Sequence, residues 1–229
     1  MTVEYIKGNI FTSRVEVLVN PVNCVGVMGA GLALEFRLRY PEMYSKYREI
    51  CNKNLLKPGL LWLYKSENIR ILNFPTKNNW KNPSKEKYLI DGLKKFTETY
   101  EEKKIKSIAF PLLGADKGGL KKEKSLEIMM HYLNPLDLEV KIYEYDDKAY
   151  DDVFFKIKSI ILNTDLDHLS NETKIRRSII DNILKSISDN DFYQVNQLLN
   201  IDEVGVVTLE KIYQFCTKQT AKGMQRNLF

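Results

Sequence analysis

The amino-acid sequence predicts an α/β fold with a substantially parallel sheet, followed by an all-helical region. Short apolar runs alternate with amphipathic segments over residues 1–147, which is the pattern of strands connected by helices. Glycine-rich loops come directly after two of these runs, at 26–31 and 114–119. From residue 148 onward the apolar residues recur only at helical spacing.

The expected elements follow one another along the chain. Strands are predicted at 3–7, 15–20, 60–64, 69–74, 105–113 and 138–145, and helices at 32–40, 43–51, 89–100 and 126–133. The strongly apolar run at 105–113 is expected to be a central, buried strand. Ser84 is the expected N-cap of the helix that carries Leu89. Helical stripes continue at 153–161, 175–187, 192–199 and 208–216, the second of them capped by Ser170 or Asn171.

Composition is that of a soluble globular protein, with 44% hydrophobic and 28% charged residues in 229. No apolar run approaches the roughly 20 residues needed to span a bilayer, and the N-terminal residues lack the apolar core of a signal peptide. We therefore expect a cytoplasmic protein with no membrane partner. The three cysteines and two histidines fit neither a disulfide framework nor a metal pattern, so no metal and no cofactor are expected.

Charge is unevenly distributed between the two parts. Residues 1–150 hold 25 Lys and Arg against 19 Asp and Glu, whereas residues 151–229 hold 10 against 11. A basic first part suits a phosphate-bearing ligand or a nucleic acid. For any single lysine run, a solvated surface is the simpler interpretation.

The stretch from Val17 to Leu34 has the pattern strand, glycine-rich loop, helix. Asn20 and Asn23 end the strand and offer amide groups for hydroxyls, while the glycines allow close approach of a ligand to the backbone. The amides at the start of the following helix suit an anion such as a pyrophosphate. Ligands of such sheets bind beyond the carboxyl ends of the strands. Packing alone is the alternative explanation for the glycines.

Five segments, in order, resemble the macrodomains of the DarG type, which reverse ADP-ribosylation of DNA. They are residues 19–34, 39–43, 57–59, 74–77 with 80–81, and 110–120. The Met-Gly-Ala-Gly sequence at 28–31 is also similar to the human terminal ADP-ribose protein glycohydrolase. The resemblance implies a three-layer α/β/α macrodomain with a mixed, largely parallel sheet over residues 1–147. Residues 148–229 would form a small all-helical C-terminal region of unknown role.

The resemblance also implies an ADP-ribose site. Asn9 and Ile10 lie where the family contacts adenine, although the family usually has Asp in place of Asn9. Asn20 and Asn23 match the first-loop asparagines, and Asn23 would face the distal ribose. The amides expected to bind the diphosphate belong to Gly29, Ala30, Gly31, Leu32, Gly118, Gly119 and Leu120. The other expected substrate contacts are Val25, Met28, Trp80, Gly114 and Ala115.

Two residues are candidates for catalysis. Lys77 matches the lysine that the glycohydrolase branch uses, and a lysine with a lowered pKa could attack the anomeric carbon and form a Schiff base. Its alternative role is that of a surface cation that binds phosphate. Asp116 replaces a residue of the family's usual Gly-Cys-Gly loop, and could act as acid and base, orient Lys77, or be a turn residue in solvent. Trp80 would stack on a substrate base or cover the helix after Ser84.

These residues together predict a glycohydrolase that removes ADP-ribose from nucleic acid, with modified bases of single-stranded DNA as the expected substrate. Such an enzyme would act as an antitoxin or in defence, with a cognate ADP-ribosyltransferase toxin as a possible partner. One alternative is a binding module that holds ADP-ribose or a related signalling nucleotide without turnover. Another is neutralisation of a toxin by contact through the helical region.

Overall fold

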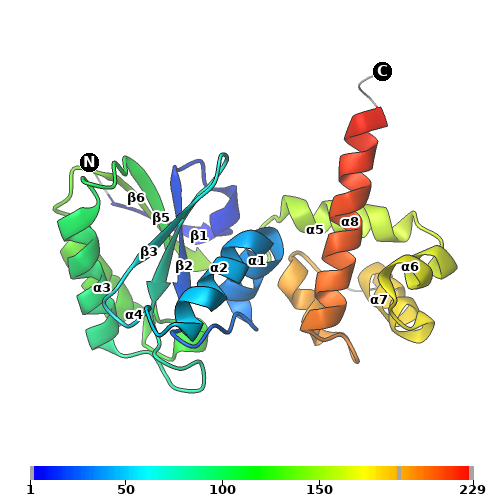
Figure 1. Cartoon of the computed structure of the whole chain (residues 1–229), viewed down its shortest axis with the longest axis horizontal. Helices are drawn as coiled ribbons and strands as arrows, with labels where there is room; N and C mark the ends of the chain where they lie inside the picture. The colour runs from blue at the N-terminus through cyan, green and yellow to red at the C-terminus, as the bar shows by residue number, and fades with distance from the viewer. Residues whose placement is uncertain (1–2, 190–191, 227–229) are drawn as a thin grey trace. The chain divides into compact units, whose positions relative to one another are not determined.

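A computed structural model of the chain describes residues 3–189 and 192–226. The chain divides into two compact units, Met1–Asp146 and Asp147–Phe229. The first unit is built of alternating strands and helices, and the second contains helices alone among its described residues (Figure 1).

The first unit is built on a six-stranded mixed sheet. Its strands, in the order in which they lie side by side, are β1 (Val3–Gly8), β6 (Glu139–Tyr145), β5 (Ser107–Pro111), β2 (Val17–Val22), β4 (Arg70–Pro75) and β3 (Trp62–Lys65). All neighbouring strands run parallel except β3, which pairs antiparallel with β4 at the edge. The carboxyl ends of β2, β4 and β5 therefore open onto the same rim of the sheet.

Helices cover both faces of this sheet (Figure 1). One face packs against α1 (Gly31–Arg39) and α2 (Pro41–Asn52), and the other against α3 (Glu86–Thr99) and α4 (Lys122–Leu133). Side chains of a strand alternate between the faces. Val17 and Val19 accordingly lie in the core with α3 and α4, whereas Leu18 lies in the core with α1 and α2. The expected three-layer α/β/α architecture and largely parallel sheet are confirmed.

Ser84 is not a helix cap, contrary to the expectation from sequence. Helix α3 begins at Glu86, its N-cap is Lys85, and no side chain caps its first turn. The backbone N–H of Ser84 instead donates to the carbonyl of Gly118 (2.9 Å). The segment before α3 is therefore tied to the second glycine loop, which keeps the Ser84 hydroxyl away from the helix.

The second unit contains α5 (Asp152–Leu162), α6 (Leu166–Thr173), α7 (Arg177–Asp189), the 3₁₀ helix η3 (Val195–Asn200) and α8 (Val206–Arg226). Two expectations are wrong here. Ser170 and Asn171 are not helix caps, because they lie inside α6, a helix that the apolar pattern did not predict. The cap of α6 is Asp165, whose carboxylate accepts from the N–H groups of Asp167 and His168. The stripe at 192–199 forms the 3₁₀ helix η3, which begins with a Gln194 and Gln197 capping box, in place of an α-helix.

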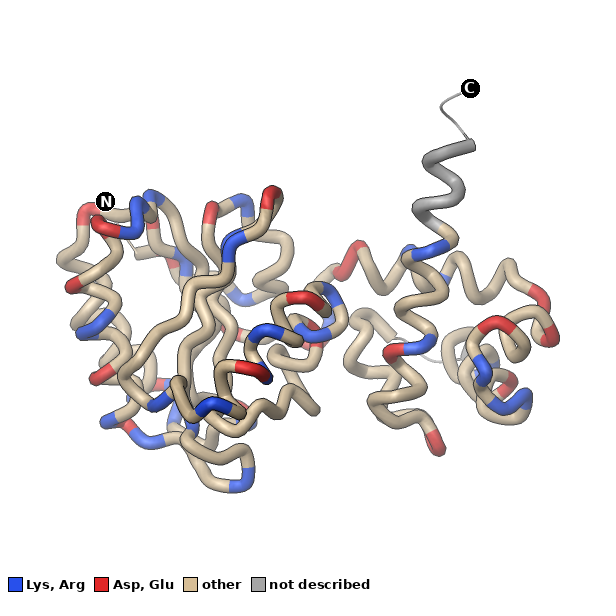
Figure 2. The backbone as a smooth tube through the Cα atoms, in the orientation of Figure 1, with Lys and Arg blue, Asp and Glu red and all other residues tan. Residues whose placement is uncertain are grey.

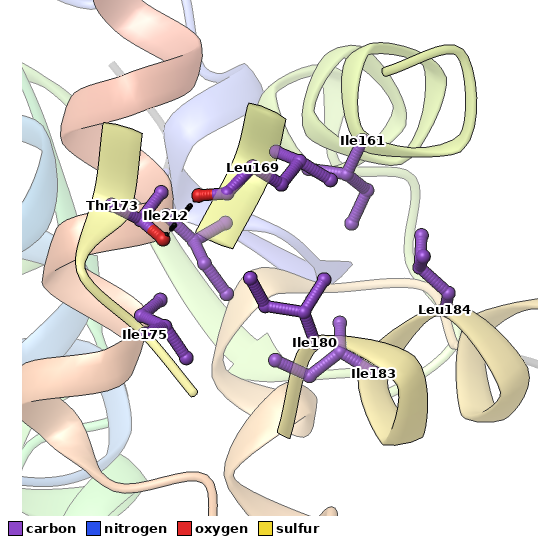
Figure 3. Close-up of a pocket in the computed structure, with 8 residues that line it drawn as sticks. All are labelled: Ile161, Leu169, Thr173, Ile175, Ile180, Ile183, Leu184 and Ile212. Carbon is purple, nitrogen blue, oxygen red and sulfur yellow. Dashed lines mark hydrogen bonds between the residues drawn. The ribbon is translucent and has the colours of Figure 1, made fainter. Parts of the chain in front are cut away.

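An apolar cavity lies within this helical unit (Figure 3). Its lining is made almost entirely of aliphatic side chains, and the Thr173 hydroxyl turns away to donate to the carbonyl of Leu169 (2.6 Å). Such a cavity suits the interior of a small helical bundle and offers no polar group to fix a ligand. The lining residues are Ile161, Leu169, Thr173, Ile175, Ile180, Ile183, Leu184 and Ile212.

Candidate functional site

Three loops meet above the carboxyl ends of the central strands in the first unit. Val22, the last residue of β2, pairs in register with Pro75 of β4. The loop after β4 is held against the loop after β2, because the N–H of Thr76 donates to the carbonyl of Val22 (2.9 Å) and the N–H of Cys24 donates to that of Asn78 (3.1 Å). These two hydrogen bonds thus hold the first glycine loop against the segment that carries Lys77.

Asn23 shapes the first glycine loop from within. Its Oδ1 accepts from the N–H groups of Val25 (3.0 Å) and Val27 (3.3 Å), and its Nδ2 donates to the carbonyl of Val27. The hydroxyl of Tyr47 donates to the Asn23 carbonyl (2.6 Å) from α2. The buried Asn23 amide is therefore committed to the loop backbone, so the structure gives it the role of fixing the loop, and direct contact with a ribose stays a prediction.

The first loop leads into an open helix N-terminus. Gly31 begins α1 with φ of 55°, and its N-cap Ala30 provides no side-chain acceptor for the amides of the first turn. These amides and the helix dipole form an electropositive site that suits a phosphate. A side chain at Gly31 would be strained by this positive φ and would meet Cγ of Lys117 at 3.6 Å. Gly29 and Ala30 are exposed beside this helix end.

The second glycine loop is a tight turn around the 3₁₀ helix η2 (Asp116–Gly118). The N–H of Leu120 donates to the carbonyl of Gly114 (2.9 Å), and Gly114 and Gly119 have φ of 71° and 82°. A Cβ on Gly118 would lie 2.7 Å from Oγ of Ser84, so this position has no room for a side chain. Ala115 and Gly118 are buried within the turn, while Gly119 is exposed.

Lys77 connects the loop after β4 to the second glycine loop. Its Nζ donates to the backbone carbonyl of Lys117 (2.6 Å), which brings the amine from the loop after β4 to the loop after β5. Burial lowers the pKa of the Lys77 amine below its ordinary value. Among the described residues no carboxylate pairs with this amine, whereas carboxylate partners raise the pKa of Lys122 and Lys141. The expected lowering of the Lys77 pKa is confirmed in direction.

No hydrogen bond or ion pair joins Asp116 to Lys77 in the part of the chain that the structure describes. Asp116 has φ of 45°, and its half-exposed carboxylate lies 4.0 Å from Nζ of Lys122. Lys122 is held in turn by Glu144 (2.7 Å), toward the ends of β1 and β6. The hydrogen bond of Lys77 goes to the Lys117 carbonyl, so Asp116 does not orient Lys77 in this structure. A role for Asp116 in proton transfer stays a prediction.

The apolar residues expected around Lys77 divide into exposed and buried ones. The Trp80 side chain is 51% exposed. Val25 and Val27 are also exposed, whereas Met28 is fully buried. Met28 packs below the loop, where its sulfur lies 3.8 Å from Nδ2 of Asn20. Met28 thus supports the first loop from the core, and Trp80 is displayed at the surface.

Asn20 and Asn9 are both buried. Nδ2 of Asn20 donates to Oδ1 of Asn73 on the neighbouring strand (3.0 Å), while Oδ1 of Asn20 has no protein partner. A buried acceptor left open in this way is unusual and suits a bound hydroxyl or water. Oδ1 of Asn9 accepts from the N–H of Phe11 (3.0 Å) and caps a 3₁₀ helix beginning at the buried Ile10. Contact of these residues with a ligand stays a prediction.

Three residues of this arrangement were missed in the sequence. Asn73 was detectable, because it is the one polar residue in the run from Ile71 to Phe74. Tyr47 and Ser84 carried no signal, since the first fits the apolar stripe of α2 and the second resembled a cap.

Across the described residues, no group of three or more His, Cys, Asp or Glu side chains could hold a metal ion. No helix in the same residues is long and apolar enough to cross a membrane.

A three-layer α/β/α unit whose glycine loops close over an open helix N-terminus belongs to the class of macrodomains. A model of the macro domain family matches residues 19–129. The solved structure titled macrodomain of Mycobacterium tuberculosis DarG is 36% identical with a TM-score of 0.59, and the match covers 62% of this chain and 97% of that one. This chain therefore belongs to the macro domain family through its first unit, with similarity to macrodomains of the DarG type.

Relatives with longer chains are similar to this chain as well. A Thermus aquaticus protein named DNA ADP-ribosyl glycohydrolase is 37% identical over 145 residues, which are 61% of this chain and 40% of that protein. A Thermosipho africanus DNA ADP-ribosyl transferase-DNA ADP-ribosyl glycohydrolase fusion protein is 35% identical over 175 residues, 68% of this chain and 45% of that protein. The structure of Thermosipho africanus DarTG in complex with ADP-ribose is 36% identical, with a TM-score of 0.62, and the match covers 66% of this chain and 44% of that one. The chain spans less than half of the length of these curated relatives.

Proposed function

We propose that this chain is a glycohydrolase that removes ADP-ribose from DNA bases, with Lys77 as its nucleophile. The observation that carries the proposal is the position of the Lys77 amine, which reaches from the loop after β4 to the second glycine loop and has a pKa lowered by burial. The names of the relatives support the choice of reaction, since they are DNA ADP-ribosyl glycohydrolases.

The ADP-ribose would lie across the two loops. In this arrangement the first-turn amides of α1 and the backbone of Gly118 to Leu120 bind the diphosphate from opposite sides. The adenine lies toward Asn9 and Ile10, and the distal ribose lies toward Lys77. The complex of a related DarTG with ADP-ribose supports this choice of ligand. The Asn23 side chain already holds the backbone of the first loop, so the entropic cost of ordering this loop when ADP-ribose binds is small.

The proposed reaction requires the Lys77 side chain in its neutral amine form, which is nucleophilic. Lys77 attacks the anomeric carbon, the bond from that carbon to the base nitrogen breaks, and the base nitrogen takes up a proton. Opening of the ribose ring gives a Schiff base, which water hydrolyses to release ADP-ribose and restore the amine. The carbonyl of Lys117 holds one N–H of the amine and leaves its lone pair available. A neutral carbonyl favours the ammonium form less than a carboxylate would, which keeps the lowered pKa of Lys77 in place.

The fused transferase of the Thermosipho africanus relative supports an ADP-ribosyltransferase as functional partner. We propose that this chain reverses the modification made by such a transferase and so acts as an antitoxin. The described residues of the helical unit contain no group of three or more His, Cys, Asp or Glu side chains that could hold a metal ion, and we propose that the role of this unit is structural or in contacts with a partner.

The test is incubation of the full chain with single-stranded DNA that carries ADP-ribose on a base. We expect release of ADP-ribose by the wild type and none by Lys77→Ala, which should still bind free ADP-ribose in calorimetry. A matched control is Lys65→Ala, since Lys65 pairs with Arg70 at the far end of β4 and should not matter. Binding without release by the wild type would make the chain a reader of ADP-ribose. Full release by Lys77→Ala would remove Lys77 from the mechanism.

A further inference from the structure

We propose that lysines and a tryptophan on the two loops beside Lys77 bind the single DNA strand that carries the modified base. These residues are Trp80, Lys81, Lys85, Lys117 and Lys121, and together they are called the loop strip. The inference rests on the proposed function for its substrate, but the strand contact itself is measurable without turnover. It adds a binding surface for the acceptor to the site already described for ADP-ribose.

The two segments of the loop strip lie side by side in the first unit. The N–H of Ser84 donates to the carbonyl of Gly118 (2.9 Å), and the Nζ of Lys77 donates to that of Lys117 (2.6 Å). A Cβ built on Gly119 would lie 4.0 Å from Cβ of Pro83. The strip therefore borders directly on the Lys77 amine, where the bond between ADP-ribose and the base would be cut.

The charges of the loop strip are available to an anion. All four lysines are exposed, and none of them forms an ion pair with any residue that the structure describes. Residues 76–85 contain three lysines and no acid. Figure 2 colours the lysines and arginines along the backbone blue and the acids red. Two acids adjoin the strip directly in sequence, Glu86 after Lys85 and Asp116 before Lys117. The Asp116 carboxylate is opposed by Nζ of Lys122 (4.0 Å). Lysines without carboxylate partners can exchange their counterions for phosphates, which makes binding to a nucleic acid favourable.

Trp80 adds a stacking surface to these charges. The ring is 51% exposed, and Nζ of Lys81 lies 5.5 Å from its centroid. The turn around it is fixed by Asn79, whose Oδ1 accepts from the N–H of Lys81 (3.0 Å) and whose carbonyl accepts from the N–H of Asn82 (3.1 Å). An exposed indole on a fixed turn can stack on a base that is not paired in a duplex. The strip therefore favours a single strand, in which bases are free to leave the stack.

The experiment measures binding of an unmodified single-stranded oligodeoxynucleotide to the full chain by fluorescence anisotropy. Lys81→Glu with Lys85→Glu should weaken binding at least tenfold. Removing two phosphate contacts should also lower the slope of log K against log salt by about 1.4, since each contact on a single strand contributes about 0.7. The matched control is Lys65→Glu with Lys94→Glu, which makes the same change of charge at exposed lysines without ion pairs. The control should bind the strand like the wild type at physiological salt.

Trp80 is tested separately from the charges. Trp80→Ala should weaken strand binding about 5- to 150-fold, and Trp80→Phe should retain most of it, because stacking needs only an aromatic face. Free ADP-ribose should bind the Lys81→Glu, Lys85→Glu variant with wild-type affinity in calorimetry. Equal strand affinity of the charge variant and the wild type would overturn the inference, as would tighter binding of duplex DNA or an acidic peptide than of the single strand. A chain that binds the strand but releases no ADP-ribose would refute the proposed function alone.

Discussion

Gly118→Ala should damage the site through one contact with Ser84. The added Cβ would lie 2.7 Å from Oγ and 3.4 Å from Cβ of Ser84, so the hydroxyl must move to at least 3.4 Å before the contact is an ordinary one. Ser84 is buried and its N–H is bonded to the Gly118 carbonyl, so movement of either residue strains that bond. Overpacking of this kind costs about 1–3 kcal/mol, and the lost flexibility of the unfolded chain offsets about 0.4–1 kcal/mol of it.

The net loss should be about 1–2 kcal/mol, which lowers the melting temperature by roughly 2–8 °C. Ser84→Ala removes the close oxygen, and in that background Gly118→Ala should cost about 1 kcal/mol less. Thermal unfolding measures the stability of each variant, and calorimetry measures its affinity for ADP-ribose. Gly29→Ala is the matched control for stability, because its Cβ would meet only Val27 at 3.7 Å. An equal cost of Gly118→Ala in both backgrounds would refute the contact as the cause.

Three further predictions concern the proposed chemistry and the first loop. Lys77→Arg keeps a positive charge that cannot be lost, so turnover should fall at least roughly 100-fold with substrate binding retained, and a borohydride reductant should trap an adduct on the wild type but not on this variant. An active Lys77→Arg would demote Lys77 to a binding residue. The kcat/KM should rise with pH and level off below the ordinary lysine pKa, because the neutral amine reacts and burial lowers the Lys77 pKa; a flat profile would contradict this. Asn23→Ala should cost about 1–3 kcal/mol of stability in thermal unfolding and weaken ADP-ribose binding, since the amides of Val25 and Val27 lose their acceptor; unchanged affinity would separate the loop from the site.

The sheet of the first unit was predictable because buried parallel strands read as continuous apolar runs. The run at 105–113 became β5 in the middle of the sheet, with Ile108 and Phe110 fully buried. The order of the loops was predictable for a related reason, since parallel strands place their carboxyl ends on one rim. The position of Lys77 follows directly from these two facts.

Features that depend on local backbone geometry were not predictable. Asp116 has φ of 45°, a conformation that the residue pattern of the turn does not specify, and its carboxylate consequently lies toward Lys122 instead of Lys77. Helix α6 was missed because it buries only Leu169 and Thr173, too few apolar residues to show a stripe. The bond from Ser84 to Gly118 joins residues 34 positions apart, which no local signal reports.

The Lys77 amine is held by a main-chain oxygen, the carbonyl of Lys117, and this bears on the effect of substitutions at position 117. Every amino acid at position 117 supplies the same carbonyl, so point mutations there leave the hold on Lys77 intact while they replace the side chain. Under the two proposals above, one residue has two separable roles, with its main chain holding the Lys77 amine and its side chain contacting the DNA strand. Substitutions at position 117 are therefore expected to change strand binding without changing the hydrogen bond that holds Lys77.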